Sequence, residues 1–398
     1  MPRSTDADTL ARLLAALESQ LPRAIELRRR LHAAPELAHV EHATSASVAA
    51  ELPVSAATVA GTGRVALVGA TASGAPVAVR AELDGLPLRE RTGAPFSAAG
   101  EAMHACGHDV HMAALVALAR AAHELGDTLP APLLAVFQPS EEAYPSGAAL
   151  LADGALARFA PRAVVGAHVH PELPWGSVAL DAGVVNASCD AFEIVIEGEP
   201  THGAYPHHGR DPVLTLAEIV LALHAHVGRR IDPLHPAVLS IGQLEAGSAE
   251  NVIPARAAAR GALRAHRPED RAALAALVRE TVAGVAAAGG CRGHVELVSG
   301  EPALANDAAI VERARALLPE ADLLPAAEWR SCGSDDLAFL GEIAPLAMAF
   351  VGLDGADGFS RRPLHHPELL VPDAAVAAVA RTQAVLFVAA AERAAASS

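Results

Sequence analysis

The segment that decides the fold is residues 132–168, PLLAVFQPSEEAYPSGAALLADGALARFAPRAVVGAH. The apolar run Pro132–Gln138 predicts a buried strand, the Ala-rich stretch Gly147–Phe159 predicts a helix, and Ala163–His168 predicts a second buried strand. Two strands joined by a helix form a β-α-β unit, in which the strands run parallel.

The same alternation extends outward from this segment in both directions. The further elements that we predict are strands at Arg64–Ala70, Val77–Leu83 and Leu346–Val351 and helices at Thr44–Leu52, Met112–Leu125 and Asp373–Ala395, with an opening helix that ends near Pro35. Strands alternating with helices predict an α/β fold with a mainly parallel sheet.

A different pattern fills residues 187–298. The predicted strands, which alternate apolar and polar residues or are strand-like in composition, are Phe192–Glu197, Val238–Gln243, Ala257–Arg264 and His294–Val298, and the predicted helices are Pro212–Val227 and Pro268–Ala288. The order β-α-β-β-α-β is typical of a compact, ferredoxin-like α+β domain with an antiparallel sheet. We therefore predict a catalytic domain made of residues 1–186 and 299–398, interrupted by a smaller domain at 187–298.

Composition excludes several classes of function. With 30 basic and 46 acidic residues among 398, the formal net charge is -16, and no basic run occurs. A nucleic-acid partner and an anionic membrane surface are therefore not expected. We predict no membrane-spanning segment and no secretory signal. The four widely spaced cysteines indicate no disulfide framework, so a cytoplasmic protein with free thiols is expected.

The strongest chemical feature is the cluster at residues 104–111, HACGHDVH, which leads directly into the helix predicted from Met112. Cys106 and His108 are ligands for a borderline metal such as zinc. Gly107 permits an unusual backbone turn that can aim both side chains at one point. His104 and His111 also admit a local packing or capping role.

Three other loops at predicted strand ends offer ligands. Glu141 and Glu142 follow the strand that ends at Gln138, where one carboxylate can bind metal while the other handles protons. The remaining imidazoles are in the pairs His168/His170 and His365/His366. Cys106, His108, Glu142, His168 and His365 make five protein ligands, too many for one open catalytic metal and suitable for two ions that share a ligand. Zn, Mn, Co and Ni all suit such a site.

These residues resemble the aminoacylase, hippurate hydrolase and auxin-conjugate amidohydrolase group of the glutamate-carboxypeptidase-like metallopeptidases. The resemblance covers nearly the whole chain, and its motifs occur in the same order. They are Arg29–Leu37, Asp84–Pro87, His104–His111, Gln138–Glu142, His168–Pro171, His202–His207, Asp211–Pro212, Asn251–Pro254, Gly333–Asp336 and His365–Pro367.

The resemblance implies a role for each matching position. Cys106 would be the bridging ligand, where sister subfamilies use aspartate, and Glu141 would be the general base. Asp84 would orient a metal ligand from behind. His202 matches a histidine that reaches the active site of the neighbouring subunit, which implies a homodimer and a lid or dimerisation role for 187–298. The weaker matches to substrate-holding groups are Asn251, Arg264 and His207.

The chain also departs from the pattern of its relatives at two positions. Glu82 stands where relatives commonly carry aspartate, and Asp335 stands where close relatives often carry glutamate. Both changes keep the charge, so we expect them to tune substrate or metal preference and to leave activity intact.

The expected function is metal-dependent hydrolysis of the amide bond of a small N-acyl amino acid. In the expected mechanism a metal-bridged water attacks the amide carbonyl. Glu141 acts as general acid and base, and His202 donates to the oxyanion. The alternatives are a metallo-dipeptidase or carboxypeptidase with the same site and a catalytically inactive binding homologue. A serine hydrolase is disfavoured because no Gly-x-Ser-x-Gly motif occurs.

Overall fold

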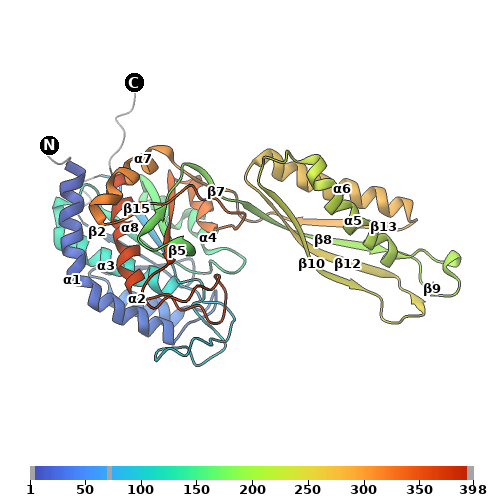
Figure 1. The fold of residues 1–398 in the computed structure, drawn as a ribbon, viewed down its shortest axis with the longest axis horizontal. Coiled ribbons are helices and arrows are strands. Elements are labelled where there is room, and N and C mark those ends of the chain that lie inside the picture. Colours follow the sequence, from blue (N-terminus) through green and yellow to red (C-terminus); the bar gives the residue numbers. More distant parts are fainter. Residues whose placement is uncertain (1–4, 70–73, 392–398) are drawn as a thin grey trace, which may run out of the picture. The chain divides into compact units, whose positions relative to one another are not determined.

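The computed structural model describes residues 5–69 and 74–391 and divides the chain into two compact units (Figure 1). Unit 1 contains residues 1–183, 305–329 and 336–398, and unit 2 contains 184–304 and 330–335. The segment predicted as an insert, 187–298, falls within unit 2. Unit 2 also takes in 330–335, which the sequence pattern had assigned to the larger domain.

Unit 1 is built on an eight-stranded sheet. In spatial order its strands are β1 (Ala57–Val59), β2 (Gly63–Val68), β4 (Leu133–Gln138), β3 (Val77–Glu82), β5 (Ala163–Pro174), β16 (Leu346–Asp354), β6 (Ser177–Ala179) and β15 (Leu324–Pro325). The four central strands β4, β3, β5 and β16 run parallel. The antiparallel pairs lie toward the edges. The predicted α/β fold with a mainly parallel sheet is therefore confirmed.

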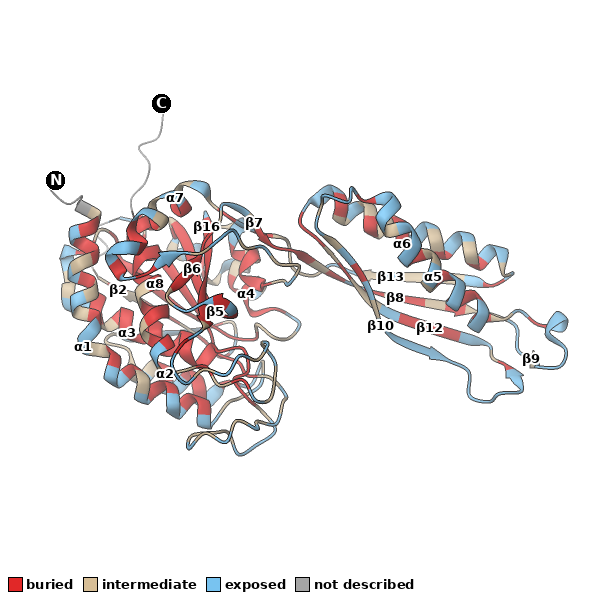
Figure 2. Cartoon of the chain, viewed as in Figure 1, coloured by how far each residue is buried: buried red, intermediate tan, exposed pale blue. Residues whose placement is uncertain are grey.

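Three long helices share one hydrophobic core with this sheet: α1 (Thr5–Ala33), α3 (His108–Leu125) and α8 (Ala374–Ala391). In α1 the fully buried Leu10, Leu13 and Leu17 recur every three or four residues, which is the period of one helix face. The central strands are buried on both faces, as parallel strands covered by helices must be (Figure 2). The shorter helices are α2 (His42–Glu51), α4 (Gly147–Leu150) and α7 (Ala308–Leu317).

The closing helix α8 is long and apolar enough to cross a membrane by length and composition, with a mean hydropathy of 1.7 over 18 residues. In the protein, 83% of those residues are buried. Because α8 packs against α1, α3 and β5, its apolar surface is accounted for by the core of unit 1.

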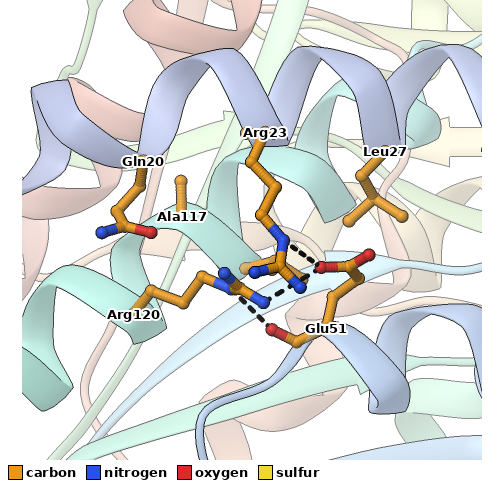
Figure 3. Close-up of a pocket in the computed structure, with 8 residues that line it drawn as sticks. Gln20, Arg23, Leu27, Glu51, Ala117 and Arg120 are labelled. Carbon is orange, nitrogen blue, oxygen red and sulfur yellow. Dashed lines mark hydrogen bonds and ion pairs between the residues drawn. The ribbon is translucent and has the colours of Figure 1, made fainter.

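An ion-pair cluster on Glu51 ties α2 to its neighbouring helices. Glu51, at the end of α2, accepts hydrogen bonds from Arg23 on α1 at 2.8 Å and from Arg120 on α3 at 3.0 Å (Figure 3). Arg30, also on α1, pairs with Glu51 at 2.6 Å. The three guanidinium groups lower the pKa of the Glu51 carboxyl, against the opposite effect of its partial burial. The small hollow lined by Arg23, Glu51 and Arg120 is thus a helix-docking contact.

Several predicted boundaries were wrong. The helix predicted over 147–159 is broken into α4, a π-helical turn at Leu151–Ala155 and a 3₁₀ turn at Ala157–Phe159. Helix α3 starts at His108 and not at Met112. Strand β5 continues to Pro174, so His168 and His170 lie within a strand and not on a loop after it. Ala70 of the predicted strand Arg64–Ala70 and residues 392–395 of the predicted closing helix lie outside the described residues.

Unit 2 has the predicted order β-α-β-β-α-β. Its elements are β8 (Ser188–Glu197), α5 (Pro212–Arg230), β10 (Ala237–Ala246), β12 (Arg256–Ala265), α6 (Pro268–Ala288) and β13 (Arg292–Val298). The four strands form an antiparallel sheet in the order β10-β12-β8-β13. Both helices share one hydrophobic cluster with this sheet, and the alternating burial along β8 shows that one sheet face is covered.

Two small sheets complete the strands of the described residues. Strand β9 (Thr201–His202) pairs with β11 (Val252–Ile253), and β7 (Gly183–Asn186) is in one sheet with β14 (Leu304–Asn306). The pairing of β9 with β11 brings the segment that contains His202 next to the segment that contains Asn251.

Candidate metal centre

The turn before α3 positions the first two candidate ligands. Cys106 precedes the helix, and His108 is its first residue, both buried. Between them, Gly107 adopts a left-handed conformation with φ of 86°. A Cβ at this position would stand 2.5 Å from Cγ2 of Val169 on β5. Both the backbone conformation and the close approach to the strand therefore require glycine.

Folding brings all five predicted ligands to one place in unit 1. The Cys106 Sγ lies 3.4 Å from His168 Nε2. The Glu142 Oε1 lies 3.2 Å from His365 Nε2 and 4.0 Å from His108 Nε2. Several sets of three donor atoms lie within 4.8 Å of one another in the described residues, among them one of His108, Glu141 and Glu142. Two of these sets are made only of predicted ligands, Cys106, His108 and His168 in one and Cys106, Glu142 and His365 in the other, and we call them the two ligand groups. Cys106 belongs to both.

The donor atoms fit divalent cations. The Nε2 of His108 and the Oε1 of Glu142 are buried and make no hydrogen bond within the described part of the chain. Buried polar atoms of that kind are rare in folded proteins and call for an ion or another partner. Two ligand atoms on one tetrahedral ion stand roughly 3.3–3.8 Å apart, close to the spacings observed here. A set of sulfur, imidazole and carboxylate donors suits borderline divalent metals.

The electrostatics of the pocket favour a cation as well. Burial lowers the pKa of the His108 imidazole, but hydrogen bonds to Asp84 and Cys106 and the charge of Glu82 raise it well above 6.5. Burial, followed by the charge of Glu142, raises the pKa of the Cys106 thiol well above its usual value. The pocket thus concentrates negative charge around His108, which a divalent ion would neutralise.

Glu141 lies at the rim of this pocket. Its Oε2 is 3.8 Å from His108 Nε2, and its side chain, like that of Glu142, keeps some exposure to solvent. The two neighbouring carboxylates can divide their roles, because the Glu142 carboxylate can bind a metal ion while the Glu141 carboxylate exchanges protons with water. This position suits a general acid and base.

Asp84 supports both sides of the centre from behind. Its Oδ2 accepts a hydrogen bond from the Glu142 amide at 2.9 Å, and its backbone carbonyl lies 2.9 Å from His108 Nδ1. Burial raises the pKa of Asp84, but its contact with His108 and the amides of Glu142 and Glu141 lower it below the usual value. Asp84 is therefore ionised near neutral pH, and its contacts suit a residue that orients the His108 ring.

His365 is held by its backbone. It has a φ of 65°, which is unusual for a residue with a side chain. The His365 amide donates to the Ala105 carbonyl at 2.9 Å, so its loop is tied to the residue before Cys106. A second tie joins the Arg91 amide to the Pro367 carbonyl at 2.8 Å. The neighbouring His366 accepts from the Glu368 amide in a local turn.

Comparison with known proteins identifies the family. Residues 78–386 match the sequence profile of peptidase family M20/M25/M40, a range that includes every candidate ligand. The chain belongs to this family.

Curated relatives of this M20/M25/M40 member include deacetylases. An N-acetyl-L-cysteine deacetylase of Bacillus subtilis is 34% identical over 368 residues, which cover 91% of this chain and 86% of the relative. An N-acetyldiaminopimelate deacetylase of Bacillus licheniformis is 30% identical over 368 residues, which cover 91% of this chain and 96% of the relative.

Solved structures agree with the fold of the M20/M25/M40 member. A Bacillus subtilis protein described as a dinuclear metal-binding peptidase of the M20 family matches with a TM-score of 0.80 at 28% identity, covering 93% of this chain and 98% of that one. A Staphylococcus aureus protein, described provisionally as an aminohydrolase, matches with a TM-score of 0.87 at 27% identity over 95% and 98% of the two chains. Together with the ligand set, these findings make this M20/M25/M40 member a metal-dependent hydrolase of amide bonds that uses divalent ions.

The family member also contains a buried network that sequence reasoning left unassigned. His111 Nδ1 lies 2.7 Å from Glu82 Oε2, and His111 Nε2 accepts from the Val169 amide at 3.1 Å. Both ring nitrogens of His111 are thus engaged, and the ring packs against the His168 ring with centroids 4.6 Å apart. Arg80 pairs with Glu82. The spacing offered a signal, since His111 lies one helical turn beyond His108.

His104 is buried, and its ring nitrogens make no hydrogen bond within the described residues. Burial lowers its pKa to about 4. The ring is therefore neutral near pH 7.

In unit 2 the predicted residues of this M20/M25/M40 member fall into two places. His202 on β9 pairs in register with Val252, and the amide of Gly203 donates to the Asn251 carbonyl at 2.7 Å, so His202 and Asn251 are neighbours. His207 lies in the adjoining turn Pro206–His208, with Tyr205 between the two imidazoles. Arg264 lies at the far end of β12, where it donates to the Cys332 carbonyl at 3.1 Å.

Proposed function

We propose that this protein hydrolyses the amide bond of N-acyl amino acids, as in the aminoacylase and hippurate hydrolase group, with Glu141 as general acid and base. The observation that carries this proposal is the position of Cys106 between two ligand groups, with Glu141 3.8 Å from His108. Deacetylases of N-acetyl-L-cysteine and N-acetyldiaminopimelate among the relatives support it.

The mechanism assigns each side chain a task. Two divalent ions, held by Cys106, His108, Glu142, His168 and His365, would lower the pKa of water and polarise a carbonyl group. Glu141 accepts the proton of the attacking water and delivers it to the departing nitrogen, so the amide carbon gains oxygen and the amine leaves neutral. Asp84 keeps the His108 ring and the Glu142 backbone in place.

The nature of the ions follows from the donor set. One thiol, three imidazoles and one carboxylate suit Zn, Mn, Co or Ni, and disfavour the hard cations Ca and Mg, which prefer oxygen ligands.

A panel of substrates tests the proposed function. Metal-reconstituted protein is assayed with N-acetyl and N-benzoyl amino acids and with dipeptides that carry the same C-terminal residue. We expect release of the free amino acid from the N-acyl compounds with a kcat/KM at least about ten-fold above that for the dipeptides. The reverse preference would favour the metallo-dipeptidase or carboxypeptidase. Metal binding with no turnover of any compound would favour an inactive homologue.

We also propose a homodimer in which unit 2 supplies His202 to the partner's active site, as the family resemblance implies. Surface chemistry supports the dimer. Leu214 and Leu221 of α5 are 58% and 72% exposed and stand seven residues apart, on one helix face. Leu244, 58% exposed, lies on β10 at the edge of the sheet. Exposed apolar groups beside an unpaired sheet edge are typical of a self-association surface.

Subunit mixing tests this arrangement. His202→Ala and Glu141→Gln are each expected to be inactive as homodimers. When the two are unfolded together and refolded in equal amounts, half of the dimers combine an intact Glu141 with the partner's intact His202. About a quarter of wild-type activity should return, as expected for two-fold dimers formed at random. If activity stays at the level of the separate variants while sedimentation shows mixed dimers, His202 does not act across subunits.

A further inference from the structure

Three aromatic rings gather beside the metal centre in unit 1. They belong to His170 on β5, Phe350 on β16 and Trp329 after β15. Ring centroids are 4.7 Å apart between His170 and Trp329 and 4.2 Å apart between Trp329 and Phe350. Phe350 is buried, whereas His170 and Trp329 keep part of their surface exposed. The cluster is therefore not closed into the core, and we call it the aromatic wall.

The aromatic wall starts one step beyond a metal ligand. Side chains alternate along a strand, so His170 shares a sheet face with His168 and lies roughly 6.6 Å further along β5. Phe350 is the register partner of His168 on the adjacent parallel strand, which places its side chain on that face as well. A group attached to a carbonyl that reacts beside His168 is thus within reach of these rings.

The charges around the aromatic wall are of both signs, and Asp181 and Arg315 offset each other. The Trp329 amide donates to Asp181 Oδ2 at 3.0 Å, and the exposed Glu172 follows His170 by two residues. The guanidinium of Arg315 is engaged by Asp181 Oδ1 at 3.0 Å. Asp181 is thus compensated by a cation and an amide, and the three rings present an apolar surface that would attract a flat, uncharged group.

We propose that the aromatic wall of His170, Trp329 and Phe350 receives the acyl half of the substrate and selects aromatic acyl groups, such as benzoyl, over acetyl. The proposal rests on the proposed function, because it takes the reacting carbonyl to lie at the metal centre. A benzoyl ring can stack edge-on or offset against Trp329, whereas an acetyl methyl group offers far less contact area.

Fluorescence tests the aromatic wall without turnover. The protein has two tryptophans, so Trp175→Phe leaves Trp329 as the single reporter. Metal-reconstituted Trp175→Phe is titrated with benzoate and, in parallel, with acetate. We expect a saturable change in emission with benzoate and none with acetate at equal concentration. Both ions carry a carboxylate, so the difference reports the ring. No response to benzoate, or an equal response to acetate, would overturn the proposal.

Kinetics test selectivity separately. The ratio of kcat/KM for N-benzoylalanine to that for N-acetylalanine should fall at least about ten-fold in Trp329→Ala, and less in Trp329→Phe, which keeps a ring. Trp329→Leu keeps an apolar side chain without aromaticity, leaves a smaller cavity than alanine, and serves if the alanine variant does not fold. Trp175→Ala, on the exposed turn after β5, is the matched control and should leave the ratio unchanged.

An unchanged ratio in Trp329→Ala and Trp329→Leu would refute the selectivity. If wild-type protein hydrolyses neither compound, the proposed function fails, and the fluorescence titration still decides whether the aromatic wall binds an aromatic ring.

Discussion

Replacing Glu141 by glutamine is expected to leave metal binding intact and to lower kcat at least about a hundred-fold, the usual contribution of a positioned general acid and base. Glutamine keeps the size of glutamate and can still accept a hydrogen bond, but it cannot take up a proton near neutral pH. The five candidate ligands do not include Glu141, so their donor atoms are unchanged. Bound metal is measured by elemental analysis after desalting, and turnover is measured with the best substrate of the panel.

Glu101→Gln is the matched control for this change. Glu101 is a strongly exposed carboxylate whose side chain pairs only distantly with Arg89, at 3.9 Å. It should retain both metal and turnover. Near-wild-type kcat in Glu141→Gln would remove Glu141 from its proposed role, and loss of metal would make it a ligand.

The second large effect is expected from Cys106→Ala. Because Cys106 belongs to both ligand groups, its loss should weaken the binding of both ions. The decrease in metal affinity should exceed the roughly 10- to 100-fold that loss of an outer partner of a ligand costs. Activity at fixed metal concentration should fall with it. A ligand that binds only the folded state raises the melting temperature, so the wild-type Tm should rise with added Zn or Mn and the variant's Tm should respond far less.

Cys291→Ala controls for the removal of a buried thiol. Cys291 is buried in the hydrophobic cluster of unit 2 and lies 3.4 Å from the Thr215 hydroxyl. Its replacement is expected to cost some stability through the small cavity, without altering the metal-induced rise in Tm. If Cys106→Ala still binds two ions with wild-type affinity, the shared-ligand proposal is wrong.

Local sequence was sufficient for the elements and for the ligand types. The short apolar run of β4, with Pro on both sides, predicted a strand buried on both faces. The longer Ala-rich stretches of α3 and α8 predicted helices by their length and composition. Where the local signal was ambiguous, prediction failed. The stretch 147–159 is rich in alanine and leucine, but Gly154 interrupts it, and the chain there breaks into short turns.

Contacts between side chains that lie far apart in the sequence could not be predicted from the sequence. From its chemistry alone, His111 could be a metal ligand. In the structure, however, its two ring nitrogens contact Glu82 and the Val169 amide. Trp329 stood alone in the sequence, with no motif around it. Its association with His170 and Phe350 depends on the register of β5 with β16, which hydrogen bonds between strands decide.

The sequence by itself determined the α/β fold, the inserted β-α-β-β-α-β pattern and the identity of the candidate ligands, because these depend on periodicity and on side-chain chemistry. The family resemblance had also implied that Cys106 is a shared ligand and that Asp84 orients a ligand. Only the tertiary structure decided which atoms of Asp84 contact His108 and Glu142, that both ring nitrogens of His111 are occupied, and that an aromatic wall begins next to His168. The reason is physical: the distances between these groups are set by strand register and loop closure, and neighbouring residues along the chain do not encode them.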